Sequence, residues 1–293
     1  MANELDRATL RRNGPANHPA RIISVVLRHA QKGPEGISSE GEQAAVSKGQ
    51  ELARSGIFRG IDTIQGYVSR MSRGPATLAA VARGLDRPEA AISPIVNDLL
   101  LGYGSADGES SFWGQAKLRL DAAVAETALK TRQPAEKIDL DMAERPVIEE
   151  WLRYHDQAMV DHLDPRAAAA DAAVGLGEMV RALNLRRGRL PLVRGDVGKL
   201  AITHRGALEP LLVARVLRDS QGNLVRDIDQ VGGVPLLLDG MIVIVQRDVE
   251  GKISADVIFL KGGERLQVDI PRLSPLYKRG IERERARQNA QRS

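Results

Sequence analysis

The sequence predicts an α/β protein, a three-layer α/β/α sandwich whose mostly parallel sheet lies between two layers of helices. Short apolar runs rich in β-branched residues alternate with helical patterns, first at residues 22–27 and again at 61–68. Helix-forming residues interrupt this alternation over about 103–190, and strand patterns resume beyond them. Strands that alternate with helices usually pair in parallel and are covered on both faces. We therefore expect one domain over residues 21–270 that carries a helical insertion.

The first unit is expected to be a strand, a loop and a helix. Residues 22–27 form a short continuous apolar run, which is typical of a buried strand. Residues 39–42, Ser-Glu-Gly-Glu, form a capping box that predicts a helix running to about Gly56. A second strand at 61–68 and an alanine-rich helix at 75–83 repeat the unit.

The later elements follow from composition and spacing. Residues 102–114 are rich in glycine and serine and predict a long loop, while residues 115–131 and 143–184 contain few helix breakers. A short strand at 200–203 and a helix at 207–217 come next.

Two strands close the domain, at residues 241–246 and 255–260. The turn sequence Glu-Gly-Lys at 250–252 lies between them and predicts a C-terminal β-hairpin. This hairpin offers an edge strand through which two copies of the chain could pair as a homodimer.

The net charge is confined to one end of the chain. Of the 42 basic and 38 acidic residues, six basic and two acidic ones lie in 277–293, which accounts for the whole surplus of four. The neutral remainder argues against nucleic-acid binding, which needs basic residues concentrated on a folded surface. Alternating Arg and Glu at 281–285 predict a solvated helix within a basic tail over 271–293. Residues 1–20 are polar, contain turn formers and predict a disordered lead-in.

Composition also indicates the cellular compartment. The chain contains no cysteine, which excludes disulfides, thiolate metal sites and a cysteine nucleophile and fits a reducing compartment. Residues 1–20 have no apolar signal-peptide core, and the apolar residues at 234–245 are broken by Pro235, Asp239 and Gly240. These features predict a cytoplasmic protein without a membrane span.

Two histidines follow directly on strand patterns, His29 and His204. A lone histidine at a strand end is usually a hydrogen-bonded structural residue, but two at equivalent positions meet at one edge of a parallel sheet, where ligands bind. Arg28, Arg73 and Asp98 follow or end strand patterns in the same way. Together they supply cations for phosphate oxygens, a nitrogen nucleophile and a proton donor, the parts needed for phosphoryl transfer without a metal.

No metal and no cofactor are expected. His155 and His162, each next to an aspartate, lie seven positions apart on a helical pattern. Metal sites usually need tighter spacing or a third distant ligand, so we expect a solvated helix face there.

Four segments in order along the chain resemble the motifs of the histidine phosphatase superfamily, which includes the cofactor-dependent phosphoglycerate mutases. They are Leu-Arg-His-Ala at 27–30 with 37–44, Ser-Arg-Met-Ser-Arg-Gly-Pro-Ala-Thr at 69–77, Val-Asn-Asp at 96–98 with Gly102, and Thr-His-Arg-Gly-Ala-Leu at 203–208. The resemblance covers residues 22–217. It implies a phosphatase acting on a small phosphorylated substrate.

The resemblance also implies roles for the cationic residues. His29 would attack phosphorus and form a phosphohistidine, while Arg28, Arg73 and His204 stabilise charge on the phosphoryl group. His29 must be neutral at its attacking nitrogen, which a hydrogen bond from its other nitrogen to a backbone carbonyl would arrange.

The implied proton donor is Asp98, which would protonate the leaving oxygen and then activate water. Glutamate is common at this position in the family, so Glu109 in the glycine-rich loop is the alternative donor. Lys32 is expected to add positive charge at the mouth of the site as a substrate-binding residue.

Three functions remain open. Cleavage of a phosphomonoester or a phosphohistidine is the first. Phosphoglycerate-mutase-type transfer is the second, although residues 31–35, Gln-Lys-Gly-Pro-Glu, stand where mutases hold their substrate with a hydroxyl residue and an asparagine. A phosphate-binding regulatory protein that has lost turnover is the third.

Overall fold

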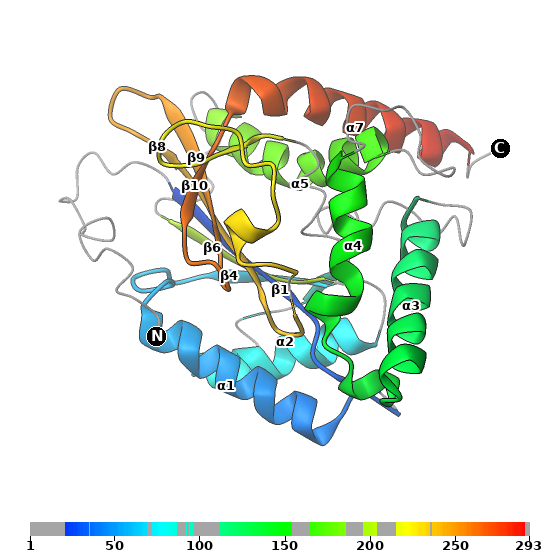
Figure 1. Cartoon of the computed structure of the whole chain (residues 1–293). Helices are drawn as coiled ribbons and strands as arrows, with labels where there is room; N and C mark the ends of the chain where they lie inside the picture. Colours follow the sequence, from blue (N-terminus) through cyan, green and yellow to red (C-terminus); the bar gives the residue numbers. More distant parts are fainter. Residues whose placement is uncertain are drawn as a thin grey trace.

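A mixed sheet forms the centre of the molecule, with helices on both faces (Figure 1). The computed structural model describes residues 21–34, 36–68, 72–86, 92, 94–96, 112–153, 165–185, 196–203, 215–234 and 236–290. Within these residues the sheet has eight strands in the order β5-β4-β6-β1-β8-β9-β10-β7. The α/β class and the layered architecture predicted from the sequence are confirmed.

The sheet has a parallel half and an antiparallel half. The parallel strands are β1 (Arg21–Arg28), β4 (Ile64–Val68), β5 (Pro94–Val96) and β6 (Val197–Thr203). The antiparallel strands are β8 (Gly240–Arg247), β9 (Ile253–Phe259), β10 (Arg265–Val268) and β7 (Leu217–Arg218). A separate small ribbon contains β2 (Lys32–Gly33) and β3 (Gly36–Ile37).

The hairpin predicted near the C-terminus is confirmed as β8 and β9, but its place in the sheet differs from the expectation. β8 pairs with β1 and β9 pairs with β10, so both strands lie inside the sheet. The expectation that this hairpin provides an edge strand is therefore wrong. The outer strands β10 and β7 have only four and two residues, too few for a recognisable strand pattern. Homodimer formation stays a prediction.

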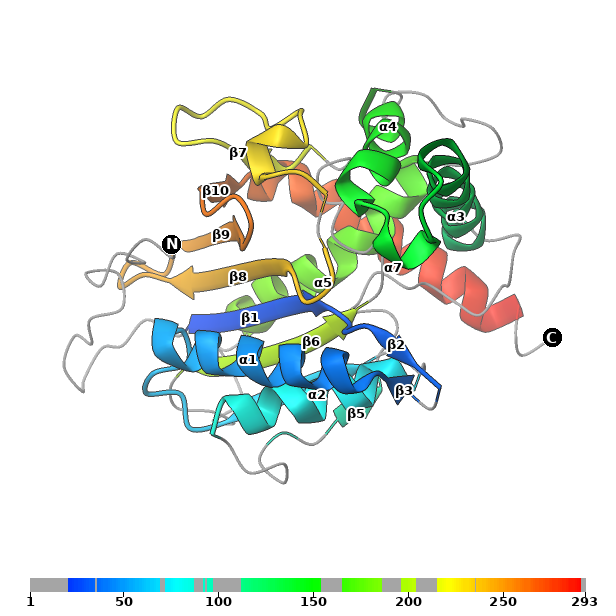
Figure 2. The ribbon, with the colours of Figure 1, turned by 60° about the horizontal axis from the view of Figure 1, so that its bottom comes forward.

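Helices cover both faces of the sheet. α1 (Ser39–Ser55) and α2 (Arg73–Gly84) lie on one face, and α5 (Pro165–Leu185) and α7 (Ile270–Ala290) lie on the other (Figures 1 and 2). α3 (Phe112–Thr131) and α4 (Leu140–Arg153) stand beside the ends of β1 and β6. Two short 3-10 helices are η3 (Ala135–Lys137) and η4 (Asp229–Val231). The helical insertion thus borders the carboxyl ends of the parallel strands.

Each face of the sheet has its own apolar core, because successive side chains of a strand point to opposite faces. Ile23, Val25 and Leu27 of β1 pack toward α1 and α2, whereas Ile22 and Val26 pack toward α5.

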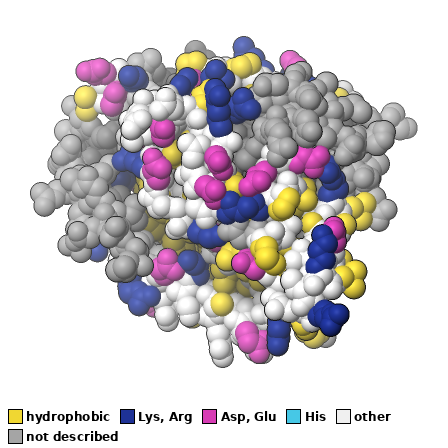
Figure 3. All heavy atoms as spheres, viewed as in Figure 1, with side chains coloured by type: hydrophobic (Ala, Val, Ile, Leu, Met, Phe, Trp, Pro, Cys, Tyr) yellow, Lys and Arg dark blue, Asp and Glu magenta, His cyan; other side chains and the backbone are white. Residues whose placement is uncertain are grey.

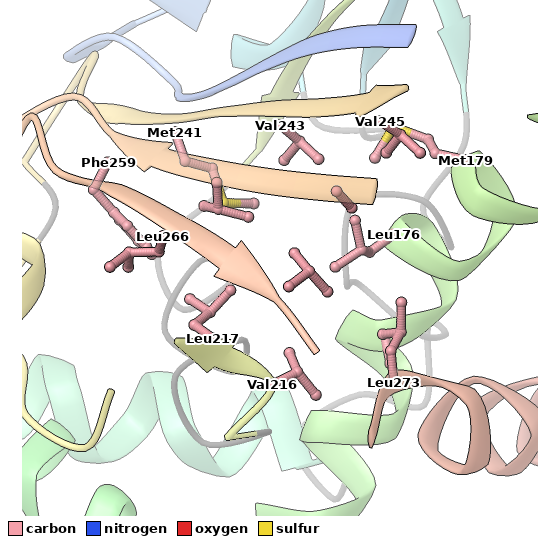
Figure 4. Close-up of a cluster of buried hydrophobic side chains, with 14 of the residues drawn as sticks. Leu176, Met179, Val216, Leu217, Met241, Val243, Val245, Phe259, Leu266 and Leu273 are labelled. Carbon is pink, nitrogen blue, oxygen red and sulfur yellow. The ribbon is translucent and has the colours of Figure 1, made fainter. Parts of the chain in front are cut away.

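Figure 4 shows the apolar core on the α5 side of the sheet. Leu176 and Met179 of α5 face Val243 and Val245 of β8, with Leu273 of α7 beside them. The helix α7 therefore closes this core from outside.

Residues 271–290, expected to lie in a basic tail, form most of α7 and pack against α5. A side chain at Gly280 would collide with the carbonyl oxygen of Ala170, and Gly177 lies against the ring of Tyr277. Such close contacts indicate that the helix is part of the folded body. Lys and Arg are interspersed with Asp and Glu on the described part of the face in Figure 3, in line with the equal numbers of basic and acidic residues before residue 277.

Several boundaries differ from the sequence expectation. The N-cap of α1 is Ser38, whose hydroxyl accepts from the Gly41 amide at 3.0 Å, so the cap lies one residue before the predicted capping box. Leu217 belongs to β7, so the helix expected at 207–217 cannot include it. Arg215 and Val216 are not helical either. The loop expected at 102–114 is wrong for residues 112–114, which begin α3. The remaining residues of the expected helix, 207–214, the lead-in at 1–20 and residues 102–111 lie outside the described residues. None of the described helices is long and apolar enough to span a membrane.

Candidate active site

The carboxyl ends of β1 and β6 lie side by side in register. Arg28 pairs with Thr203, and the amide of His29 donates to the carbonyl oxygen of Thr203 at 2.9 Å. Val68 of β4 pairs with Ile202, so β4 ends at the same edge. His29 therefore stands where the parallel strands end together.

His29 is buried and its ring orientation is fixed. Only 6% of the residue is exposed, and Nδ1 lies 2.7 Å from the carbonyl oxygen of Ala30. A carbonyl oxygen can only accept, so Nδ1 carries a proton, and in the neutral ring the lone pair is then on Nε2. The hydrogen bond expected from His29 to a backbone carbonyl is confirmed, and it selects the tautomer in which the lone pair of the neutral ring lies on Nε2.

The loop after His29 is held by both helices of the adjacent face. The amide of Ala30 donates to Oγ1 of Thr77 at 3.1 Å, and Ala30 and Thr77 are completely buried. The amide of Ser38, at the start of α1, donates to the carbonyl oxygen of Gln31 at 3.0 Å. These contacts fix the carbonyl that orients His29.

Arg28 is held on its backbone by the segment that leads into β8. Its amide donates to the carbonyl oxygen of Asp239 at 2.8 Å, and its carbonyl accepts from the Leu238 amide at 3.1 Å. The residue is only 3% exposed. The segment before the C-terminal hairpin therefore contributes to the site, a role that the sequence did not indicate.

The side chain of Arg28 meets a carboxylate that sequence reasoning missed. Nη2 of Arg28 lies 4.0 Å from Oε1 of Glu144 on α4, and Glu144 is completely buried. The one available signal was the helical spacing, since Glu144 lies one turn before the apolar Ile148 and so shares its buried face.

Asp239 is a second carboxylate near this edge. Its Oδ1 accepts from the Gly240 amide at 2.8 Å. Burial raises the pKa of Asp239 above the ordinary value, although hydrogen bonds from the backbone and the charges of Lys48 and Lys261 act in the opposite direction. The turn before β8 therefore carries a carboxyl group that resists ionisation.

The structure describes only two of the other expected site residues. Arg73 is the first residue of α2 and is half-buried, and Lys32 is exposed on β2. His204, Asp98 and Glu109 lie outside the described residues.

Among the described residues, no group of three or more His, Asp or Glu could hold a metal ion. His155 and His162 fall outside that part of the chain.

Comparison with known proteins gives likenesses to solved structures alone. No family model matches the chain, and no curated protein matches it. The phytase of Klebsiella sp. ASR1 is 13% identical, with 83% of this chain and 82% of that chain covered and a TM-score of 0.42. A mycobacterial glucosyl-3-phosphoglycerate phosphatase is 16% identical, with 82% and 98% covered and a TM-score of 0.39.

A third solved structure, the protein histidine phosphatase SixA complexed with tungstate, is 11% identical, with 82% and 96% covered and a TM-score of 0.31. All three TM-scores are below 0.5, so these likenesses assign no role to any residue of this chain.

Proposed function

We propose that the chain is a phosphohydrolase of the histidine phosphatase type, which cleaves a phosphomonoester or a phosphohistidine through a phosphohistidine on His29. The observation that carries the proposal is the state of the His29 ring. Its Nδ1 proton is committed to Ala30, so in the neutral ring Nε2 carries the lone pair that a nucleophile needs, and the preceding residue, Arg28, is a buried cation.

In the first step Nε2 of His29 attacks phosphorus in line and the bond from phosphorus to the leaving oxygen breaks. Arg28, Arg73 and His204 stabilise the charge on the transferring phosphoryl group. Asp98, or Glu109 in its place, gives its proton to the leaving oxygen, so the alcohol departs neutral. Lys32 adds positive charge at the entrance.

In the second step water attacks the phosphohistidine. The carboxylate left by the first step takes a proton from this water, the bond from nitrogen to phosphorus breaks, and inorganic phosphate leaves. No metal and no cofactor take part in either step as we propose it. Proton and charge balance are restored after one turnover.

The test is hydrolysis of p-nitrophenyl phosphate in EDTA by the wild type and by His29→Ala. We expect turnover in the wild type and its loss in the variant, together with a covalent phosphoryl mass increment that only the wild type acquires after acid quenching. A wild type without turnover on any phosphoester would favour the regulatory protein instead. Phosphoryl transfer between two phosphoglycerates, with little release of phosphate, would favour the mutase.

A further inference from the structure

Glu144 occupies a place where an apolar side chain is expected. It lies on the face of α4 that also buries Ala143 and Ile148, whereas Met142 on the same helix is 53% exposed. A carboxylate that is completely removed from water is costly unless a positive charge compensates it. Arg28 provides that charge, with its Nη2 atom 4.0 Å from Oε1 of Glu144.

The need for compensation is mutual. The side chain of Arg28 is only 4% exposed, so its guanidinium also requires an opposite charge when no phosphate is bound. The backbone of Arg28 is fixed by strand pairing and by Leu238 and Asp239, and these contacts leave the direction of the long side chain to be set by other groups. The buried negative charge of Glu144 lies close to the guanidinium and can set the direction of the Arg28 side chain.

The helix that carries Glu144 is itself anchored to the same region. Arg145 binds Asp229 of η4 at 2.5 Å, and η4 belongs to the segment that leads to Leu238 and Asp239. Glu150, farther along α4, binds Arg119 of α3 at 2.6 Å. Arg28 is thus contacted on its side chain by α4 and on its backbone by a segment tied to α4.

We propose that Glu144 is a positioning residue, which fixes the guanidinium of Arg28 by its charge and thereby couples the helical insertion to the phosphate-binding edge of the sheet. The kinetic part of this inference rests on the proposed function. A misplaced guanidinium loses the alignment needed at the transition state, whereas ground-state binding of phosphate is shared with other cations. Glu144 should therefore affect kcat more than phosphate affinity.

The experiment uses the full chain and compares Glu144→Gln, which keeps the shape and removes the charge, with Glu150→Gln on the same helix. We expect Glu144→Gln to lower kcat on p-nitrophenyl phosphate by about tenfold or more, the order that misplacement of a catalytic group produces. The Kd of inorganic phosphate, measured by calorimetry, should change by less than about threefold, since it does not depend on transition-state alignment. Glu150→Gln should match the wild type in both.

Two further variants keep the test decisive. Glu144→Asp retains the carboxylate one methylene farther from Arg28, and its kcat should lie between the wild type and Glu144→Gln; it replaces Glu144→Gln if that variant does not fold. In an Arg28→Ala background, Glu144→Gln should cause no further loss of kcat, because Glu144 acts through Arg28.

The inference is overturned by wild-type kcat in Glu144→Gln, or by an equal fractional loss with and without Arg28. A wild type that lacks turnover refutes the proposed function but still leaves this inference testable. The same double-mutant cycle is then read from urea unfolding, where non-additive midpoint shifts support the Arg28–Glu144 coupling and additive shifts refute it.

Discussion

Replacement of Thr77 by valine tests how the orientation of His29 is maintained. Thr77→Val keeps the shape of the side chain and removes the oxygen that accepts from the Ala30 amide at 3.1 Å. Both residues are completely buried, so no water can replace the lost acceptor. A buried donor without a partner costs about 1–3 kcal/mol, and the added methyl group returns up to about 0.8 kcal/mol. We expect a net loss of about 1–2 kcal/mol in the free energy of unfolding.

The loss is measurable by urea unfolding. With an m-value of about 3 kcal/mol/M, the midpoint should fall by roughly 0.3–0.7 M. Because the Ala30 carbonyl orients the His29 ring, kcat on p-nitrophenyl phosphate should also fall, by about tenfold or more.

Thr77→Ser is the matched control. It keeps the hydroxyl and removes a methyl group from the core, which costs about 1 kcal/mol. The two variants should therefore have similar stability, but Thr77→Ser should retain kcat within about threefold of the wild type, since the hydrogen bond that it keeps holds the catalytic geometry. If both variants lose kcat equally, or if Thr77→Val retains it, the hydrogen bond does not position His29.

Three other predictions address different parts of the molecule. Arg73→Ala should lower kcat on aryl phosphates by about a hundredfold, as removal of a transition-state donor does; wild-type rates would mean that the phosphate pocket lies elsewhere. Asp239→Asn should raise the midpoint of thermal unfolding at pH 8 but not near pH 3. Burial raises the pKa of Asp239 in the folded protein. Ionisation of this carboxyl therefore destabilises the fold as the pH rises past the ordinary aspartate pKa of about 3.9, and asparagine cannot ionise. A variant that is less stable than the wild type at pH 8 would contradict this sign. Asp269→Ala removes the side chain that accepts from the Arg272 amide at the start of α7 and should lower unfolding free energy at neutral pH by about 1–2 kcal/mol. Burial favours neutral Asp269, but hydrogen bonds from Arg218 and Arg272 lower its pKa overall, so its contribution should be lost as pH falls below about 4. A difference in urea midpoint between the wild type and Asp269→Ala that is the same at pH 3 and pH 7 would refute this prediction.

The sequence predicts those parts of the fold that local patterns determine. The strand ending in Arg28 is a short β-branched run, and its parallel pairing with the strand before His204 follows from the alternation of strands and helices. The hydrogen bond at His29 was also predictable, because the chemistry of the nucleophile requires one protonated ring nitrogen.

Other features depend on contacts between distant segments and have weak local signals. Which of the adjacent residues Ser38 and Ser39 caps α1 depends on where the chain enters the helix, and the neighbouring loop at Gln31 decides that point. The pairing of Glu144 with Arg28 joins the insertion to the first strand, and no spacing rule connects them. A charged residue on the apolar face of a helix shows that a partner is needed, but it does not identify the partner.

The antiparallel half of the sheet has a catalytic consequence under this mechanism. Because β8 runs opposite to β1, the start of β8 lies beside the end of β1, where Leu27 pairs with Gly240. A side chain at Gly240 would collide with the carbonyl oxygen of Val26, so only glycine lets β8 approach at this point. The same approach brings Leu238 and Asp239 within hydrogen-bond distance of the Arg28 backbone. The position of Arg28, which we propose to bind phosphate, therefore depends on a strand that follows all four motif-like segments, so those segments alone do not define the proposed site.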